Sequence, residues 1–223
     1  MKLTAKEIRH IDEVLIERGL DYIDLKYEIL DHMANGIEAL MVNEDLSFEE
    51  AFSKELKNWK HEFKPYSHFL FGYTEVGPRI VIKRCVNLIK QMYLKSIIGG
   101  LLIAFCLLCF FKLIPTGLYI DGVSFIAGFV YTISTLVALY FLYIAAKFQI
   151  KSTYQYFLKV NGRAHWIALF LFNPFWEWSI KFDVVNSNFL DLFWPSAIII
   201  MNFFMIKTFF DHRKTANYQI TLK

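Results

Sequence analysis

The fold of this chain is decided by residues 95–115, which read KSIIGGLLIAFCLLCFFKLIP. Sixteen residues without a charge separate Lys95 from Lys112. A helix that crosses the hydrocarbon core of a bilayer needs about 20 apolar residues. Lys112 fits such a helix because its ammonium group can reach the headgroups while its stem stays in lipid. We therefore predict that this stretch is the first membrane-spanning helix.

On the N-terminal side of that stretch, an acidic segment is followed by a basic one. Residues 1–75 carry nine Lys or Arg against sixteen Asp or Glu, a net charge of −7, and residues 76–95 carry five basic residues and no acid, a net charge of +5. The acidic N-terminal part is expected to repel nucleic acid and anionic lipid, so no nucleic-acid partner is predicted, whereas the basic segment is expected to attract anionic lipid headgroups. No apolar segment follows the N-terminus closely, so we expect no cleaved signal peptide.

Four membrane-spanning helices are predicted after the basic segment, at residues 96–114, 122–146, 163–180 and 189–210. In the second, Ser124, Gly128 and Thr132 recur every four residues, a spacing that lets another helix approach closely within the bundle or in a homo-oligomer. Asn202 in the fourth is expected to form a hydrogen bond with a neighbouring helix.

The third predicted span is interrupted by Asn173, Pro174 and Glu177. Proline removes a backbone hydrogen bond and disfavours helical angles at the residue before it, which predicts a kink. Polar groups within a membrane are candidates for an ion or substrate site. Tryptophans bracket the segment, however, so anchoring at the membrane interface is the competing interpretation.

The distribution of Lys and Arg predicts the topology. Five basic residues precede the first span, four lie between Lys147 and Arg163, and four follow from Lys207, whereas the other two connections hold only Lys112 and Lys181. Under the positive-inside rule both termini are cytosolic. We therefore expect a multi-pass protein of a bacterial inner membrane.

Residues 1–65 predict a small cytosolic domain of three amphipathic helices, so the fold class expected for the whole chain is all-α. Thr4 with Glu7 and Ser47 with Glu50 form capping-box patterns that begin the first and third helices, and Gly19 is expected to end the first. Each helix is predicted to bury one apolar face. In the first helix this face consists of Ile8, Ile11 and Leu15. In the second it consists of Tyr27, Leu30, Ala34, Ile37 and Met41, and in the third of Phe52, Leu56, Trp59 and Phe63.

Residues 66–95 are predicted to be an interfacial linker, and residues 211–223 a cytosolic tail. The aromatic run 66–73 suits the headgroup level of a membrane. A basic amphipathic helix from Arg79 is expected to lie on anionic lipid and to continue into the first span.

The N-terminal helices resemble the HAAS-type helical domains over residues 4–60. The resemblance lies in Glu28-Ile29-Leu30-Asp31-His32, in Ile37-Glu38 and in Leu46-Ser47-Phe48-Glu49-Glu50-Ala51. Those domains precede membrane segments in bacterial proteins and often accompany PadR-type transcription regulators. The resemblance implies a bacterial signalling or regulatory module and carries over no catalytic residue.

Four residues on consecutive turns of the second helix are candidates for docking a basic partner: Asp24, Glu28, Asp31 and His32. The alternative is a solvated helix face, which such charge runs usually form. A metal site would need a closed ligand set that this stretch does not specify. No phosphate-binding loop, dinucleotide fingerprint, zinc-protease motif or nucleophile elbow occurs, so no catalytic, cofactor-binding or metal-ligating residue is predicted.

Three functions are consistent with these features. The first is a non-enzymatic regulatory or signalling membrane protein whose helical head binds a cytosolic partner. The second is an accessory subunit of a membrane transporter or other complex. The third is a lipid-modifying enzyme that uses His165, Asp211 and His212 at the inner membrane interface.

Overall fold

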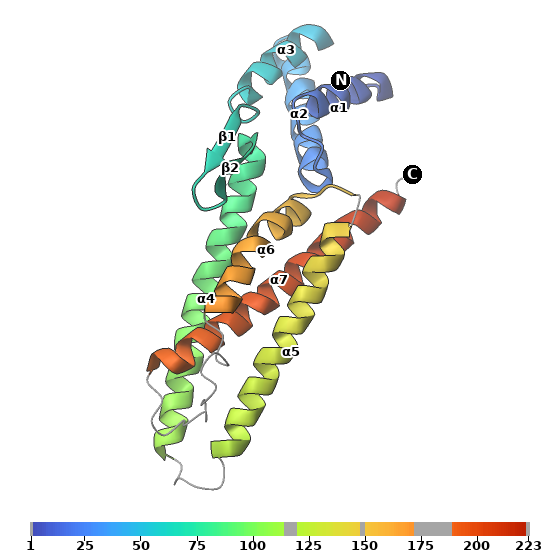
Figure 1. Cartoon of the computed structure of the whole chain (residues 1–223). Coiled ribbons are helices and arrows are strands. Elements are labelled where there is room, and N and C mark those ends of the chain that lie inside the picture. Colours follow the sequence, from blue (N-terminus) through green and yellow to red (C-terminus); the bar gives the residue numbers. More distant parts are fainter. Residues whose placement is uncertain (1, 114–119, 148–149, 172–188, 222–223) are drawn as a thin grey trace. The chain divides into compact units, whose positions relative to one another are not determined.

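The computed structural model describes residues 2–113, 120–147, 150–171 and 189–221. Within these ranges the chain is mostly helical (Figure 1). The elements are α1 (Ala5–Glu17), α2 (Ile23–Asn43), α3 (Phe48–Trp59), β1 (Pro65–His68), β2 (Gly72–Pro78), α4 (Arg79–Leu113), α5 (Ile120–Lys147), α6 (Thr153–Leu171) and α7 (Phe189–Thr221).

The chain divides into two compact units. The head unit comprises residues 1–87, 148–156 and 212–223, and the helical unit comprises residues 88–147 and 157–211. The head unit is therefore larger than the predicted domain of residues 1–65, because residues 66–87 and two short segments from the second half of the chain belong to it. Each unit is described separately below.

The core of the head unit is formed by α1, α2 and α3. Ile11, Leu15, Met33 and Ile37 are fully buried there, and Val81 from α4 joins the same cluster. The predicted face of α3 is confirmed, since Phe52 and Phe63 are buried and Leu56 and Trp59 pack against the cluster. In α1, Ile8 is 39% exposed, so only two of its three predicted core positions are filled.

The buried face of α2 agrees with the prediction at Ile37 and Met41 and differs from it earlier in the helix. The buried residues are Ile23 and a set spaced four apart: Leu25, Ile29, Met33, Ile37 and Met41. Tyr27, which was expected in the core, is 38% exposed. The observed stripe is apolar at every position, and so it buries more apolar surface than a face that includes a phenol.

Both predicted capping boxes are present. The Thr4 hydroxyl accepts a hydrogen bond from the Glu7 backbone, and Ser47 does the same for Glu50. Backbone and side-chain hydrogen bonds from Thr4 hold the pKa of Glu7 below its usual value, and those from Ser47 hold the pKa of Glu50 below its own. α1 ends as predicted at Gly19, whose φ of 81° is one that glycine adopts without strain.

Two antiparallel strands lie where an interfacial linker without strands was expected. β1 pairs with β2 so that Pro65 lies opposite Pro78 and His68 opposite Gly72. Gly72, with a φ of 108°, forms the tight turn between them. Prolines at the ends and glycines within the segment disfavour a helix, while tyrosine, threonine and valine favour a strand.

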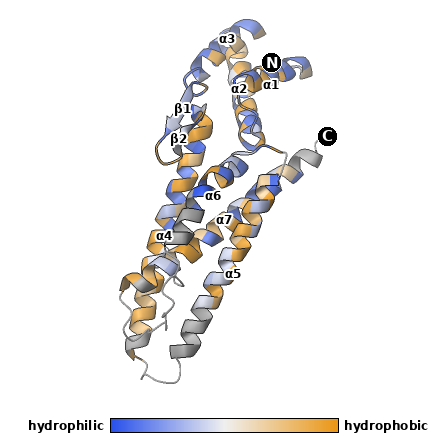
Figure 2. Cartoon of the chain, viewed as in Figure 1, coloured by the Kyte–Doolittle hydropathy of each residue, from blue (hydrophilic) through white to orange (hydrophobic). Residues whose placement is uncertain are grey.

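Among the residues that the structure describes, three helices are long and apolar enough to cross a membrane. They cover Arg79–Phe110, Gly128–Lys147 and Leu192–Asn217, and Figure 2 shows the contrast between hydrophobic α4 and the more hydrophilic α1 and α3. Large apolar side chains such as Leu102, Phe105 and Leu136 are more than 60% exposed on these helices. Such exposure is expected where lipid, rather than water, surrounds a helix.

As expected from the sequence, α4 begins at Arg79 and continues without a break into the first predicted span. The helix bounds differ from the predicted spans at two other places. α6 begins at Thr153, ten residues before the predicted third span, because Ser152 caps it by accepting a hydrogen bond from the Gln155 backbone. α7 continues to Thr221 through the predicted tail. Asn173, Pro174 and Glu177 lie outside the described residues.

Candidate functional site

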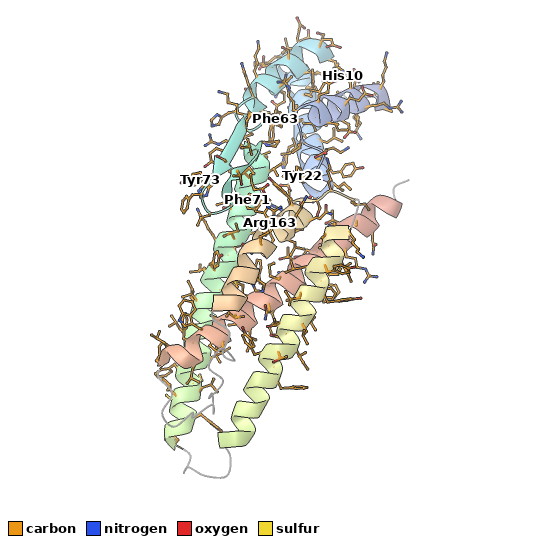
Figure 3. The ribbon with its side chains drawn as sticks, in the orientation of Figure 1. His10, Tyr22, Phe63, Phe71, Tyr73 and Arg163 are labelled. Atoms are coloured by element: carbon orange, nitrogen blue, oxygen red, sulfur yellow. The ribbon has the colours of Figure 1, made fainter. Side chains whose placement is uncertain are left out.

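A groove of about 410 Å³ opens on the head unit at the C-terminal ends of α1 and α3. We call it the basic groove. Its lining consists of Arg18, Ser53, Leu56, Lys57, Lys60, Phe63, Lys64 and Pro65. Leu56 and Phe63 also belong to the head core or pack against it, so the apolar part of the lining is continuous with a well-packed interior. Figure 3 labels Phe63, just beyond α3.

Local chain geometry positions the cations of the groove. Arg18 is the C-cap of α1, and the next two backbone N–H groups bond back into the helix, Gly19 to Ile16 at 2.9 Å and Leu20 to Leu15 at 3.0 Å. Such a closing motif fixes the direction in which the chain leaves the helix. Lys57 lies in the last turn of α3, where a cation complements the partial negative charge of the helix end.

The groove carries positive charge without a matching acid. Its lining contains four cations and no carboxylate. Among the residues that the structure describes, none of these four side chains lies within 4.0 Å of a carboxylate oxygen. Lys54, one turn before Lys57, instead reaches Glu44 at 2.6 Å and 2.5 Å. The groove can therefore receive an anionic group without displacing an existing ion pair.

The four predicted docking residues do not form one free face. Asp24 accepts hydrogen bonds from Thr153, through its backbone N–H at 2.8 Å and through its hydroxyl. Glu28 lies 3.9 Å from Arg84. Asp31 and His32 are exposed. Asp24 thus serves inside the molecule, where its carboxylate caps the first turn of α6.

Further contacts join the start of α2 to residues 150–156. Asp21 forms an ion pair with Lys151, and the Ile23 backbone N–H donates to the Lys151 carbonyl at 3.0 Å. The buried Ser152 hydroxyl lies 2.7 Å from His212 Nδ1. These contacts attach α2 to the segment that precedes α6, which explains why residues 148–156 belong to the head unit.

Two tyrosines near this contact have strongly raised pKa values. Burial, followed by the charge of Asp21, raises the pKa of Tyr22 to about 12. Burial also raises the pKa of Tyr156 above its usual range, and the hydrogen bond that its hydroxyl donates to Glu75 at 3.0 Å adds to the increase. The rings of Tyr22 and Tyr156 are in contact, with centroids 5.6 Å apart.

A buried polar cluster lies in the helical unit. Asn202 of α7 is fully buried, and its side-chain amide donates to Ser134 at 3.1 Å and Thr135 at 3.2 Å on α5. Its carbonyl oxygen lies 2.8 Å from His165 Nε2 on α6. Asn202 therefore bonds to two neighbouring helices. His165, expected at the membrane interface, is 1% exposed here.

Close helix packing in the helical unit occurs at an adjacent pair of glycines in α4, Gly99 and Gly100. A Cβ on Gly100 of α4 would lie 2.8 Å from the Ala197 Cβ and 3.0 Å from its Cα on α7. In the predicted stripe, Thr132 is exposed and donates to the Gly128 carbonyl at 2.8 Å. The Ser124 side chain lies outside the described residues.

Two residues of the enzyme hypothesis, His165 and His212, form hydrogen bonds with different residues. His165 contacts Asn202 in the helical unit, and His212 contacts Ser152 in the head unit. Within the described ranges, no group of three His, Cys, Asp or Glu side chains could hold a metal ion. The enzyme hypothesis stays a prediction.

Sequence reasoning missed Arg18, Gly99 and Gly100. The two glycines were visible as an unusual pair inside an apolar run, a pattern typical of close helix contact. Arg18 carried no such signal, because it joins the lysines of α3 only through tertiary packing. Comparison with protein-family models, curated proteins and solved structures finds no match to this chain.

Proposed function

We propose that this chain is a non-enzymatic, multi-pass regulatory protein of a bacterial inner membrane, whose head unit binds an acidic segment of a cytosolic protein in the basic groove. The three long apolar helices support the membrane part of the proposal. The excess of Lys and Arg before the first span, between Lys147 and Arg163 and after Lys207 supports cytosolic termini. The resemblance to HAAS-type domains favours a regulatory role.

The single observation that carries the partner-binding part is the charge of the groove. Arg18, Lys57, Lys60 and Lys64 surround an apolar lining and have no acidic partner in the described part of the chain. Charged groups arranged in this way attract a ligand of opposite sign and fix its orientation. An acidic peptide with one apolar side chain satisfies both the cations and the lining.

Other anions fit the groove less well. A bilayer presents a broad surface that cannot enter a concavity of about 410 Å³. Nucleic acid is an extended polyanion, and residues 1–75 around the groove carry nine basic and sixteen acidic residues, a net charge of −7. That field opposes a long polyanion, whereas a short segment meets mainly the nearby cations within a Debye length of about 8 Å.

Binding of a short peptide to the full chain in lipid nanodiscs tests the proposal. The probe is a fluorescein-labelled peptide of alternating glutamate and leucine, and its Kd is measured by fluorescence anisotropy. Replacing Lys57 and Lys60 by alanine removes two exposed charge pairs worth about 0.5–1 kcal/mol each. We therefore expect the Kd to rise about five- to thirtyfold, and added salt to weaken wild-type binding.

The matched control is Lys54→Ala, which removes a lysine from the same helix outside the groove. It should leave the Kd within about twofold of wild type, since Lys54 is engaged by Glu44. A peptide in which glutamine replaces glutamate should bind poorly. Equal weakening by the control and by the groove variant would show that the lysines act only through net charge, and the groove would not be the binding site.

A further inference from the structure

The turn of the β-hairpin exposes several large apolar side chains. Phe69 is 61% exposed, Leu70 37%, and on β2 Tyr73 is 76% and Val76 61% exposed. In Figure 3, Tyr73 is labelled at the outer side of the hairpin. A water-soluble surface tolerates scattered apolar residues, but Phe69 and Leu70 are adjacent at the turn, and large exposed apolar side chains grouped in this way are typical of an interaction site.

The turn is held in a defined conformation rather than left as a loose loop. The Leu70 backbone N–H donates to His68 Nδ1 at 3.2 Å, and the Phe71 N–H donates to the His68 carbonyl at 2.9 Å. Phe71 points the other way and is 2% exposed, with its ring edge-on to Tyr156 at 5.0 Å. The Phe71 anchor therefore fixes Phe69 and Leu70 in their outward position.

The charge around the turn suits a lipid headgroup region. Residues 66–74 contain no Lys, Arg, Asp or Glu. The nearest acids are engaged: Glu75 accepts the Tyr156 hydroxyl, and Glu62 pairs with Lys83 at 2.7 Å. The hairpin leads directly into Arg79 at the start of α4, a helix long and apolar enough to cross a membrane.

We propose that the hairpin turn inserts Phe69 and Leu70 into the bilayer interface and so anchors the head unit to the membrane surface. Aromatic and leucine side chains are favoured at that depth, where the ring is in apolar surroundings and polar tips such as the Tyr73 hydroxyl stay hydrated. This anchor is independent of the basic groove and of its partner.

Lipid quenching of a fluorophore tests the insertion. The full chain carries Cys106→Ala and Cys109→Ala, and Cys85 stays because it is buried. Phe69→Cys is labelled with an environment-sensitive fluorophore, and the protein is reconstituted into phosphatidylethanolamine–phosphatidylglycerol vesicles that contain nitroxide lipid. Val42→Cys is the matched control, because Val42 is 60% exposed on the same unit. We expect the probe at 69 to be quenched by lipid about threefold more than the probe at 42.

The aqueous quencher iodide should give the reverse order. Equal lipid quenching at both positions, or equal access of iodide, would overturn the proposal. Protection of position 69 from both quenchers would also overturn it, since another protein chain would then cover the turn. Because the label itself replaces Phe69, a second variant carries the probe at Tyr73→Cys. Phe69→Ser with Leu70→Ser should then reduce lipid quenching at position 73, and unchanged quenching would contradict the anchor.

Discussion

At the scale of single residues, Asp24 shows how a surface acid becomes structural. Its carboxylate accepts hydrogen bonds from the backbone and hydroxyl of Thr153, and it lies at the positive end of α6. We expect Asp24→Ala to destabilise the head unit by about 1–2 kcal/mol, the usual cost of losing a helix cap. Asp24→Asn should lose less stability than Asp24→Ala, because the amide oxygen of asparagine still accepts a hydrogen bond. Thermal unfolding in nanodiscs measures both.

Asp31→Ala is the control for this prediction, because Asp31 is an exposed acid of the same helix and of the same predicted docking set. It should change the stability by less than about 0.5 kcal/mol. If Asp24→Ala and Asp31→Ala unfold at the same temperature, the contact between Asp24 and Thr153 contributes nothing measurable to stability. Sequence alone could not separate the two acids, since the partner of Asp24 lies 129 residues away along the chain.

At the scale of elements, α4 and α7 approach each other through Gly100 and Ala197. A Cβ on Gly100 would lie 2.8 Å from the Ala197 Cβ and 3.1 Å from its backbone nitrogen, so any larger side chain must push the helices apart. We expect Gly100→Val to destabilise the helical unit by about 1–3 kcal/mol or more, the range for overpacking. The midpoint of thermal unfolding in nanodiscs is the measurement.

A control variant and a compensating variant test whether the clash with Ala197 causes this loss of stability. Leu102→Val changes a side chain on α4 that is 61% exposed, and it should be nearly neutral. Ala197→Gly removes one of the clashing atoms, so in combination with Gly100→Val it should restore part of the stability. Strict additivity of the two substitutions would contradict a direct contact.

Local elements were predictable where local chemistry decides them. The capping boxes and Gly19 fixed the ends of α1 and the start of α3 because their hydrogen bonds lie within a few residues. The hairpin was missed, since short aromatic runs fit an interface or a strand equally well by pattern. The first half of the buried face of α2 was misassigned because several apolar periodicities overlap there, and packing against α1 and α3 selects among them.

The candidate site was predictable only in part. Four lysines recur at spacings of three and four along α3 and the turn after it, and this spacing indicates one basic face: Lys54, Lys57, Lys60 and Lys64. A groove, however, needs a second wall. Arg18 supplies that wall from α1, and no spacing along the chain connects Arg18 with Lys57. Lys54 shares the same spacing yet pairs with Glu44 instead. Tertiary packing, rather than sequence periodicity, decides which cations remain available.

At the scale of the whole molecule, stability at high pH should be set by the head unit. The pKa of Tyr22 is raised from 10.0 to about 12 in the folded state, mainly by burial. Below pH 10 the phenol is protonated in both folded and unfolded chains, so its contribution to stability is fully present. Above pH 10 the unfolded chain ionises first, and the contribution is lost as the pH rises toward 12.

We therefore expect the thermal stability of the full chain in nanodiscs to fall between pH 10 and pH 12, with a smaller loss in Tyr22→Phe. Phenylalanine keeps the ring that contacts Tyr156 but has no proton to lose. Tyr156 and Cys85, whose pKa values burial also raises, contribute to the part that remains. Tyr27→Phe is the control, because Tyr27 is 38% exposed on the same helix. If thermal stability falls between pH 10 and pH 12 by the same amount in Tyr22→Phe and in wild type, ionisation of Tyr22 does not determine the stability of the head unit at high pH.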